Sequence, residues 1–223
     1  MRLKAMNDLI RTGYLMTRPD SADLLARLEF ELAERNGLRE YMGIALNTEG
    51  ISFAIRGDLT KAAAKLEGAR AIFEELHEQS QLAGTLNNLG NIYDNRGDKA
   101  QAIDRLTQSL KIAEAVKDSA LMARALGNIG VIYFEVDDYG HAMEYYQRRL
   151  ALAVKVKDDQ IVAEVLNNIA IIDGIRGDTA AAIDQYERSI AISERIDYGQ
   201  QLAGSLSNLG SIYFARGDQI RAM

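Results

Sequence analysis

Apolar residues recur along the chain at the spacing of amphipathic helices. In the segment 81–96 they are separated by intervals of four, three and four residues, at Leu82, Leu86, Leu89 and Tyr93. This spacing places them on one face of a predicted helix. Gly97 can close that helix in the left-handed conformation, and Asp98 can cap a second helix that buries Ala102, Leu106 and Leu110. The segment therefore predicts two helices joined by a tight turn.

The same pair of helices recurs with a fixed period of 40 residues. Leucine keeps this period at Leu46, Leu86, Leu126, Leu166 and Leu206. Asparagine keeps it at Asn88, Asn128, Asn168 and Asn208, and a small residue keeps it at Gly50, Gly90, Gly130, Ala170 and Gly210. A fixed period of this kind is the signature of a solenoid, in which each repeat packs only on its neighbours.

We expect one continuous array over residues 1–223. Its repeats span about 1–40 (degenerate), 41–79, 80–119, 120–159, 160–199 and 200–223 (partial). The turn of the first repeat contains Pro19 instead of glycine, which suits a helix start. In the second repeat, Glu49 and Ser52 stand at phases that are apolar in later copies. Because the last repeat stops early in its second helix, we expect the chain to be a fragment of a longer protein.

Composition argues against several classes of function. The net charge is −6 and the pI is about 5.1, a balance opposite to that of proteins that neutralise nucleic-acid phosphates. The chain has no cysteine and two histidines, so it offers little material for disulfides, zinc sites or nucleophilic triads. No apolar run is long enough to span a bilayer. We therefore expect a soluble cytoplasmic protein that is not an enzyme, with no cofactor, no metal, no nucleic-acid partner and no membrane partner.

Two short motifs have structural explanations. The tripeptide Arg-Gly-Asp occurs four times, beginning at Arg56, Arg96, Arg176 and Arg216. Each copy falls at the turn between paired helices, so helix closure by glycine and capping by aspartate explain it better than integrin recognition does. Glu74 and His77 have the spacing of a di-iron ligand pair. The equivalent Glu114 and Lys117 do not repeat it, which favours a solvated surface pair.

The repeat resembles the tetratricopeptide repeat in its core positions, which in one well-matched copy are Leu86, Leu89, Gly90, Tyr93, Ala102, Leu106 and Ser109. Departures from the family pattern are Arg149 at a usually small position, Asp173 in place of an aromatic residue, and a period of 40 residues instead of about 34. The longer period is similar to that of the Pins/LGN adaptors, kinesin light chains and Rap-type bacterial regulators. The resemblance implies an all-α, right-handed superhelical solenoid of helix-turn-helix repeats.

The resemblance also implies a concave groove, lined by the first helices of successive repeats, that receives a peptide or helix of a partner protein. Carried over by position, its lining residues are Asn87, Asn88, Asn91, Asn95, Arg124, Asn128, Phe134, Glu164, Asn167, Asn168, Asn208 and Phe214. Two roles are open for the asparagines. Their amides can hold the backbone of an extended ligand, or they can bond to the neighbouring repeat and set the stacking. Arg124 and Glu164 either add charge selectivity or are simply solvated.

The function predicted from these features is a non-catalytic scaffold for protein–protein interaction. The alternative is a sensory or regulatory arm of a larger signalling protein, such as a kinase, a cyclase or a transcription regulator, whose output domain is absent from this chain. Self-association through the open C-terminal end after Ala222 is a third expectation.

Overall fold

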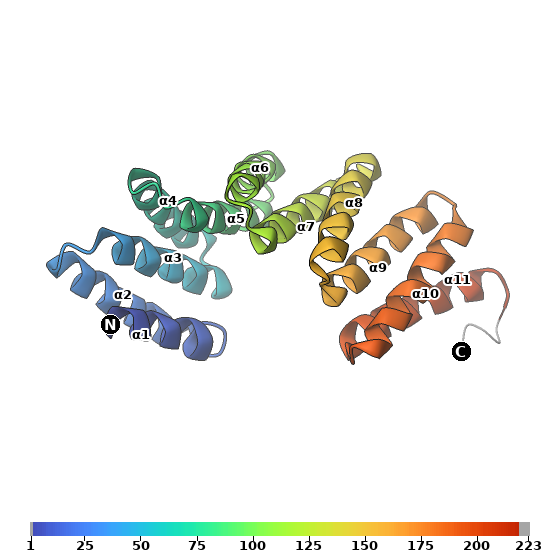
Figure 1. The fold of residues 1–223 in the computed structure, drawn as a ribbon, viewed down its shortest axis with the longest axis horizontal. Coiled ribbons are helices and arrows are strands. Elements are labelled where there is room, and N and C mark those ends of the chain that lie inside the picture. The colour runs from blue at the N-terminus through green and yellow to red at the C-terminus, as the bar shows by residue number, and fades with distance from the viewer. Residues whose placement is uncertain (1, 219–223) are drawn as a thin grey trace. The chain divides into compact units, whose positions relative to one another are not determined.

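The computed structural model describes residues 2–218, and within this range all regular elements are helices (Figure 1). The chain begins with α1 (Arg2–Leu9), the π-helical segment η1 (Ile10–Tyr14) and α2 (Pro19–Arg35). The later elements are α3 (Arg39–Ile55), α4 (Leu59–Glu75), α5 (Gln79–Asn95), α6 (Lys99–Val116), α7 (Ser119–Glu135), α8 (Tyr139–Val156), α9 (Asp159–Ile175), α10 (Thr179–Arg195) and α11 (Gly199–Ala215). The fold is an all-α helical repeat solenoid, as the sequence predicts. The expected start of a further helix after Asp218, and the expected open end at Ala222, lie outside the described residues.

The chain divides into two compact units, Met1–Asn128 (unit 1) and Ile129–Met223 (unit 2). In unit 1, α2 packs on α3, α3 on α4, α4 on α5, and α5 on α6. In unit 2, α8 packs on α9, α9 on α10, and α10 on α11. Helices that are consecutive in sequence are therefore neighbours within each unit, which confirms the helix-turn-helix organisation.

Glycine and aspartate form the turns inside the repeats. Three turns contain glycine with φ between 81° and 83°, in the left-handed region, at Gly57, Gly97 and Gly177. The following aspartate caps the next helix, and Oδ1 of Asp98 accepts a hydrogen bond from the backbone N–H of Gln101 at 3.1 Å. Asp58 and Asp178 cap their helices in the same way. The turn function predicted for these Arg-Gly-Asp copies is confirmed. In the turn before α8, Asp137 takes the place of glycine with φ of 60°.

Small residues allow the two helices of a repeat to approach each other closely. A Cβ atom added to Gly90 on α5 would lie 2.5 Å from Cγ of Leu106 on α6, and one added to Gly50 on α3 would lie 2.6 Å from Cγ of Leu66 on α4. Both leucines are fully buried. A larger residue at either glycine would force the leucine to move, because real Cβ contacts of this length do not occur.

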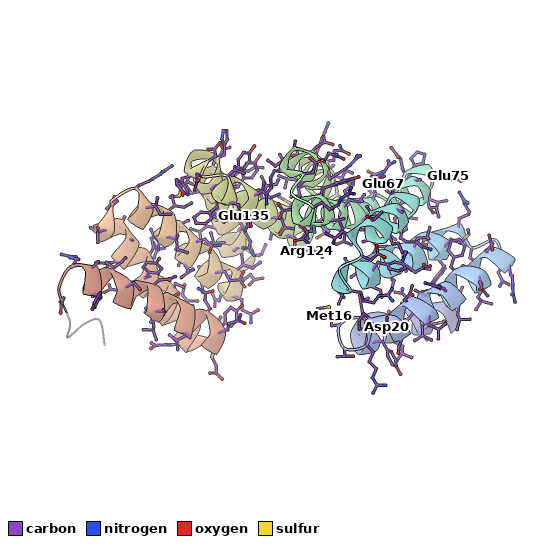
Figure 2. The ribbon with its side chains drawn as sticks, turned by 180° about the vertical axis from the view of Figure 1, so that it is seen from behind. Met16, Asp20, Glu67, Glu75, Arg124 and Glu135 are labelled. Carbon is purple, nitrogen blue, oxygen red and sulfur yellow. The ribbon has the colours of Figure 1, made fainter. Side chains whose placement is uncertain are left out.

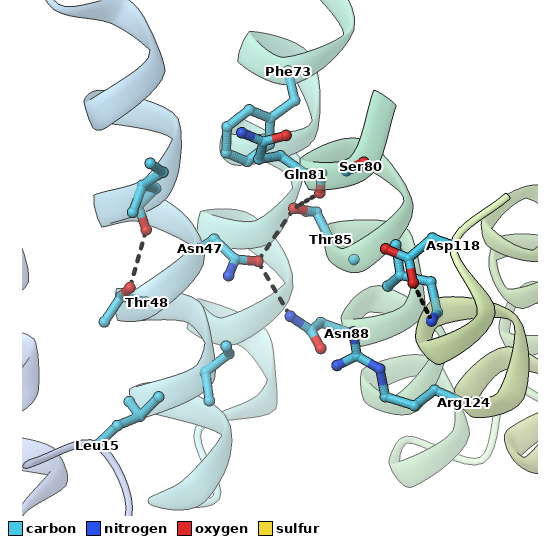
Figure 3. A pocket seen from close by; sticks show the side chains of 14 residues that line it. Leu15, Asn47, Thr48, Phe73, Ser80, Gln81, Thr85, Asn88, Asp118 and Arg124 are labelled. Atoms are coloured by element: carbon cyan, nitrogen blue, oxygen red, sulfur yellow. Dashed lines mark hydrogen bonds between the residues drawn. The ribbon is translucent and has the colours of Figure 1, made fainter. Parts of the chain in front are cut away.

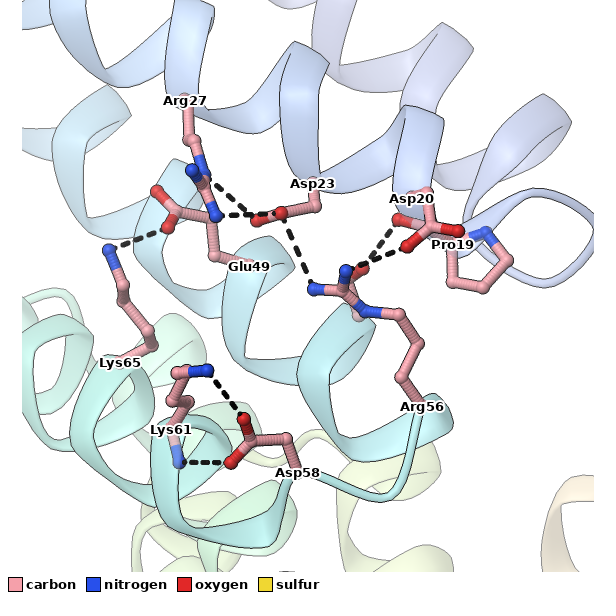
Figure 4. Close-up of polar contacts among 10 residues, drawn as sticks. Pro19, Asp20, Asp23, Arg27, Glu49, Arg56, Asp58, Lys61 and Lys65 are labelled. Atoms are coloured by element: carbon pink, nitrogen blue, oxygen red, sulfur yellow. Dashed lines mark hydrogen bonds and ion pairs between the residues drawn. The ribbon is translucent and has the colours of Figure 1, made fainter.

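Polar side chains take part in the packing around α2 and α3 (Figure 4). Ser52 Oγ donates a hydrogen bond to a backbone oxygen of α2 at 2.6 Å. Lys65 Nζ lies 2.6 Å from Oε2 of Glu49, which is 2% exposed. Arg56 of the turn after α3 pairs with Asp23 of α2 at 3.3 Å. Glu49 and Ser52, which the sequence places at core phases, are therefore buried with polar partners.

Candidate functional site

Asparagines on the first helices of successive repeats form hydrogen bonds between those repeats. In each bond the Nδ2 of one asparagine donates to the Oδ1 of an asparagine 41 residues earlier. The bonds are 3.1–3.2 Å long and join Asn88 to Asn47, Asn128 to Asn87, and Asn208 to Asn167. We call these three pairs the amide ladder. The first two pairs lie in unit 1 and the third lies in unit 2.

The ladder shows which of the two expected roles the donor amides have. Asn88, Asn128 and Asn208 bond to the neighbouring repeat and contribute to the stacking. Asn87, which the sequence places on the groove surface, is only 3% exposed, and its oxygen accepts the amide of Asn128. It therefore belongs to the interface between repeats. The donor asparagines are half-buried, and no described residue donates a hydrogen bond to their own carbonyl oxygens, so these oxygens can still accept one from a ligand.

The ladder is interrupted at one place between residues 47 and 208. The residue 41 positions before Asn168 is Gly127, which has no side chain to accept a hydrogen bond. Asn168 is half-buried, and its amide makes no hydrogen bond with the described part of the chain. Both the donor and the acceptor of this predicted groove residue are therefore open.

Unit 1 contains an open cavity of about 540 Å³ (Figure 3). Its lining comes mainly from α3, α5 and the start of α7, and it includes Leu15, Ile44, Asn47, Thr48, Ile51, Phe73, Ser80, Gln81, Gly84, Thr85, Asn88, Asp118, Leu121 and Arg124. Ligand pockets in proteins are commonly about 300–1,000 Å³. The cavity is thus large enough for side chains of a bound segment, and it brings together two predicted groove residues, Asn88 and Arg124.

Several polar side chains of the cavity are held by other protein groups. Oδ1 of Asn47 accepts hydrogen bonds from Asn88 and from Oγ1 of Thr85, each at 3.2 Å. Nε2 of Gln81 donates to Oε1 of Glu40 at 3.1 Å. These contacts fix α5 on α3, and the polar groups that make them are less available to a ligand.

Arg124 differs from these residues because nothing in the described chain pairs with it. The side chain is exposed, and its guanidinium has no ion pair or hydrogen bond with any residue in 2–218. Figure 3 shows it extending from α7 toward the side of the cavity where Asn88 lies. In Figure 2, Glu67 and Glu75 of α4 lie away from it. A free guanidinium beside an open amide oxygen can bind an anionic group and a hydrogen-bond donor together.

Glu164 of unit 2, the other charged groove residue predicted, is already paired. Nη2 of Arg149 donates to its Oε2 at 3.1 Å, and the Tyr198 hydroxyl donates to its Oε1 at 3.0 Å. The bond to Glu164 raises the pKa of Tyr198 above its usual value. Arg149 stands where the neighbouring copies have Ser109 and Ser189, so the departure from the repeat pattern supplies one partner of Glu164. The two charged residues that the sequence treats alike therefore have different surroundings.

The remaining predicted groove residues lie outside the unit 1 cavity. Phe134 is half-buried, and its ring meets that of Tyr139 edge-on at 5.6 Å between centroids. Phe214 is 70% exposed on α11. Asn91 is half-buried and Asn95 is exposed near the end of α5.

Most of the cavity lining is missing from the sequence prediction, and three of its members show why. Asn47 stands one period before Asn87 and acts as the same kind of acceptor, so the period itself could have identified it. Thr85 donates to Asn47 as Ser205 donates to Asn167. Gly84 has no such signal, because the equivalent residues along the chain are Ile44, Arg124, Glu164 and Gly204.

The titratable groups with the most altered pKa values lie in helix packing and do not line the cavity. Burial raises the pKa of Glu29 to about 7, against the lowering effect of a hydrogen bond from Asn7. Burial also raises the pKa of Tyr146 and of Tyr186 to about 12. Among the described residues, no group of three or more histidine or acidic side chains could hold a metal ion. No helix in the described range is long and apolar enough to cross a membrane.

Comparison with protein families identifies the repeat. A family model described as tetratricopeptide repeat matches residues 41–115 and 121–195. These two segments contain most of α3–α6 and α7–α10. A search of curated proteins finds none that matches this sequence.

Solved structures share the fold at low sequence identity. BtubC (BKLC) from P. vanneervenii is 24% identical with a TM-score of 0.79, and the match covers 92% of this chain and 87% of that chain. A STAND signal-transduction ATPase with a tetratricopeptide repeat sensor, from Pyrococcus horikoshii, is 15% identical with a TM-score of 0.82. The match covers 99% of this chain and 34% of that chain. A Rap protein complexed with competence and sporulation factor is 16% identical with a TM-score of 0.68. The match covers 98% of this chain and 66% of that chain. This chain therefore spans about a third of the STAND protein.

Proposed function

The chain belongs to the tetratricopeptide repeat family, and from this premise we propose that it is a non-catalytic scaffold for protein–protein interaction. The partner contributes a peptide or a helix, which binds on the surface that α3, α5 and the start of α7 form in unit 1. The observation that carries the proposal is the cavity there, where Arg124 and Asn88 keep polar groups that no described residue engages.

The amide ladder supports this proposal through preorganisation. The bond from Asn88 to Asn47 joins α5 to α3, and the bond from Asn128 to Asn87 joins α7 to α5. The binding surface is therefore held in place before a ligand arrives, and little ordering cost falls on the scaffold. The carbonyl oxygen of Asn88 can then accept a backbone N–H of an extended ligand.

One structural neighbour supports binding of a partner by this fold. The Rap protein structure contains competence and sporulation factor bound to the protein. We extend to this chain the capacity to bind a protein or peptide partner, and not that particular factor.

A photo-crosslinking pair tests the proposal. Benzoylphenylalanine is placed at Ser80, which is exposed and lines the cavity, or at Asp104, which is exposed on α6 and does not line it. Illumination in a lysate of the native cell should give a discrete crosslinked protein from the Ser80 variant alone. A crosslink from Asp104 alone, or none from either position, contradicts binding in the groove.

A second candidate function is a sensory or regulatory arm of a larger signalling protein of the kinase, cyclase or transcription-regulator class. The STAND ATPase neighbour favours it, because that protein carries a tetratricopeptide repeat sensor and this chain matches 34% of its length. The gene sequence after the codon for Met223 tests it. An in-frame catalytic or DNA-binding domain supports the regulatory arm, and an immediate stop codon contradicts it.

We also propose that the protein is cytoplasmic and that it self-associates weakly through α11. The absence of cysteine fits a reducing compartment. Leu206 and Phe214 of α11 are 49% and 70% exposed and form apolar surface that a second copy can cover. Light scattering should show a mass that rises with concentration in the wild type and less in Phe214→Ser. A constant monomer mass contradicts self-association.

A further inference from the structure

Gly84 opens the unit 1 cavity although helix packing does not require a glycine there. The nearest heavy atom to a Cβ added at Gly84 would be Cδ2 of Leu121, at 3.9 Å, which is ordinary van der Waals contact. Gly90, on the same helix α5, would bring its Cβ to 2.5 Å from Leu106. A glycine inside a helix lowers helix stability relative to alanine. Gly84 thus weakens α5 without a packing benefit, and what it provides is space in the cavity.

Apolar side chains line the same cavity as Gly84, and Leu121 is the nearest to it. Phe73 and Leu121 line the cavity and are 1% and 4% exposed, and half-buried Ile44 lines it from α3. Such a surface favours a large apolar side chain of a ligand, because its burial removes apolar area from water.

The charges of the same cavity favour an anionic neighbour for that apolar side chain. Arg124 is the cationic side chain among the lining residues, and it has no protein partner in the described chain. The acidic lining residue Asp118 caps α7, since its Oδ1 accepts the backbone N–H of Leu121 at 2.9 Å. A guanidinium can donate two parallel hydrogen bonds to a carboxylate. One cavity therefore offers both apolar side chains and a carboxylate-binding group.

We propose that this cavity selects an internal segment of a partner protein that carries an acidic side chain for Arg124 and, close to it in sequence, a large apolar side chain for the space over Gly84. The inference rests on the proposed function, since it defines which segment the groove binds. The selectivity belongs to unit 1, because the repeats place different residues at this phase, namely Ile44, Gly84, Arg124, Glu164 and Gly204.

A peptide library measures this preference directly. Random decapeptides with acetylated N-termini and amidated C-termini carry charge only on their side chains, and the pool retained by the wild-type chain is sequenced. The pool should be enriched in Asp or Glu near Leu, Met or Phe. Arg124→Glu should lower the affinity for those peptides about 10-fold to 100-fold and enrich Lys and Arg instead. Arg35→Glu is the control, because Arg35 is an exposed arginine of α2 outside the cavity.

A filled cavity tests the apolar half of the proposal. Gly84→Leu should lose the preference for large apolar residues while its circular dichroism stays helical. Gly204→Leu makes the same change at the equivalent position of α11, where nothing lies within 4 Å of an added Cβ, and it should leave the pool unchanged. An unchanged pool in Gly84→Leu overturns the apolar half.

The outcomes separate this inference from the proposed function. If the wild type retains peptides without acidic enrichment, and Arg124→Glu retains the same pool, the selectivity is refuted while groove binding stands. A matched library with free C-termini tests where the carboxylate comes from. If the retained peptides need a free C-terminal carboxylate and show no enrichment in Asp or Glu, an internal acidic side chain is refuted as the group that binds Arg124. If the wild type retains no peptide and the Ser80 crosslink also fails, the proposed function itself is refuted.

Discussion

The two glycines of α5 lie on two faces of one helix that are subject to different constraints. Gly90 lies on the face packed against α6, where an added Cβ would lie 2.5 Å from Leu106. Gly84 lies on the face that lines the cavity, where the nearest atom to an added Cβ is 3.9 Å away. The packed face allows no other residue without rearrangement, whereas the cavity face allows larger residues and leaves the space empty.

The polar residues divide between the same two kinds of surface. Between repeats, Asn128 donates to buried Asn87, and the two side chains satisfy each other. In the cavity, Arg124 has no partner among the described residues. Folding accounts for the residues of the packed surfaces, whereas the open groups of the cavity face remain available to a ligand.

The largest effect is expected from Gly90→Ala. The new Cβ overlaps Leu106, so the variant should lose about 3 kcal/mol of unfolding free energy through overpacking. Urea denaturation followed by circular dichroism measures the loss. An unchanged midpoint would show that α6 yields easily and would remove the contrast between the two faces of α5.

The second prediction concerns Glu29, whose carboxyl group is buried in helix packing, and the dependence of the unfolding free energy on pH. Glu29 is fully buried, its Oε1 has no hydrogen-bond partner among the described residues, and burial raises its pKa from 4.5 to about 7. Because the folded state binds this proton more tightly, the stability contributed by the neutral form is fully present below pH 4.5 and is lost as the pH rises through about 7. We expect a loss of about 2 kcal/mol over that interval.

Melting temperatures of the wild type and of Glu29→Gln between pH 4.5 and pH 8 check this expectation. The glutamine variant cannot ionise at this position, so its curve should lack the loss that the wild type shows. Parallel curves for the two proteins would mean that Glu29 does not titrate in this range.

Asn128 and Asn168 stand at the same phase of the repeat but should contribute differently to stability. Asn128→Ala leaves the buried oxygen of Asn87 without its donor, which should cost about 1–2 kcal/mol of stability. Asn168→Ala removes an amide that bonds to no described residue, so its stability should stay within about 0.5 kcal/mol of the wild type. Chemical denaturation of both variants gives the comparison, and equal losses would contradict the separation.

The smallest effect is expected from Gly84→Ala. The methyl group meets nothing closer than 3.9 Å, and alanine favours the helix over glycine, so stability should rise by up to about 1 kcal/mol. Gly204→Ala is the matched control on α11 and should rise similarly. A loss of stability at Gly84 would indicate that its space is needed by the fold.

Much of the fold can be predicted from the sequence because its determinants repeat. The 40-residue period identifies the paired helices, and the Arg-Gly-Asp turns follow from the capping preferences of glycine and aspartate. Gly90 is recognisable as a contact position because a small residue recurs at its phase. Each of these signals is local or periodic, so neighbouring copies reinforce it.

The candidate site is less predictable because its residues depend on partners from other helices. The sequence groups Arg124 with Glu164, yet Glu164 is held by Arg149 and Tyr198, which lie 15 and 34 residues away. The sequence also puts Asn87 on the groove surface, but the rotation of α5 buries it between repeats. Gly84 stands at a phase with no common residue type, so only the empty space beside it reveals its importance.

The constant separation within the amide ladder makes the repeats exchangeable units for recombination. Each donor follows its acceptor by 41 residues, one more than the period, so a tandem duplication of residues 81–120 would add one further rung and leave the existing ones in register. Deletion of residues 121–160 would remove Gly127 and set Asn168 the same 41 residues after Asn87. In a shorter gene of that kind every donor would follow an acceptor by 41 residues, so the array can change length by whole repeats while the spacing of the ladder is kept.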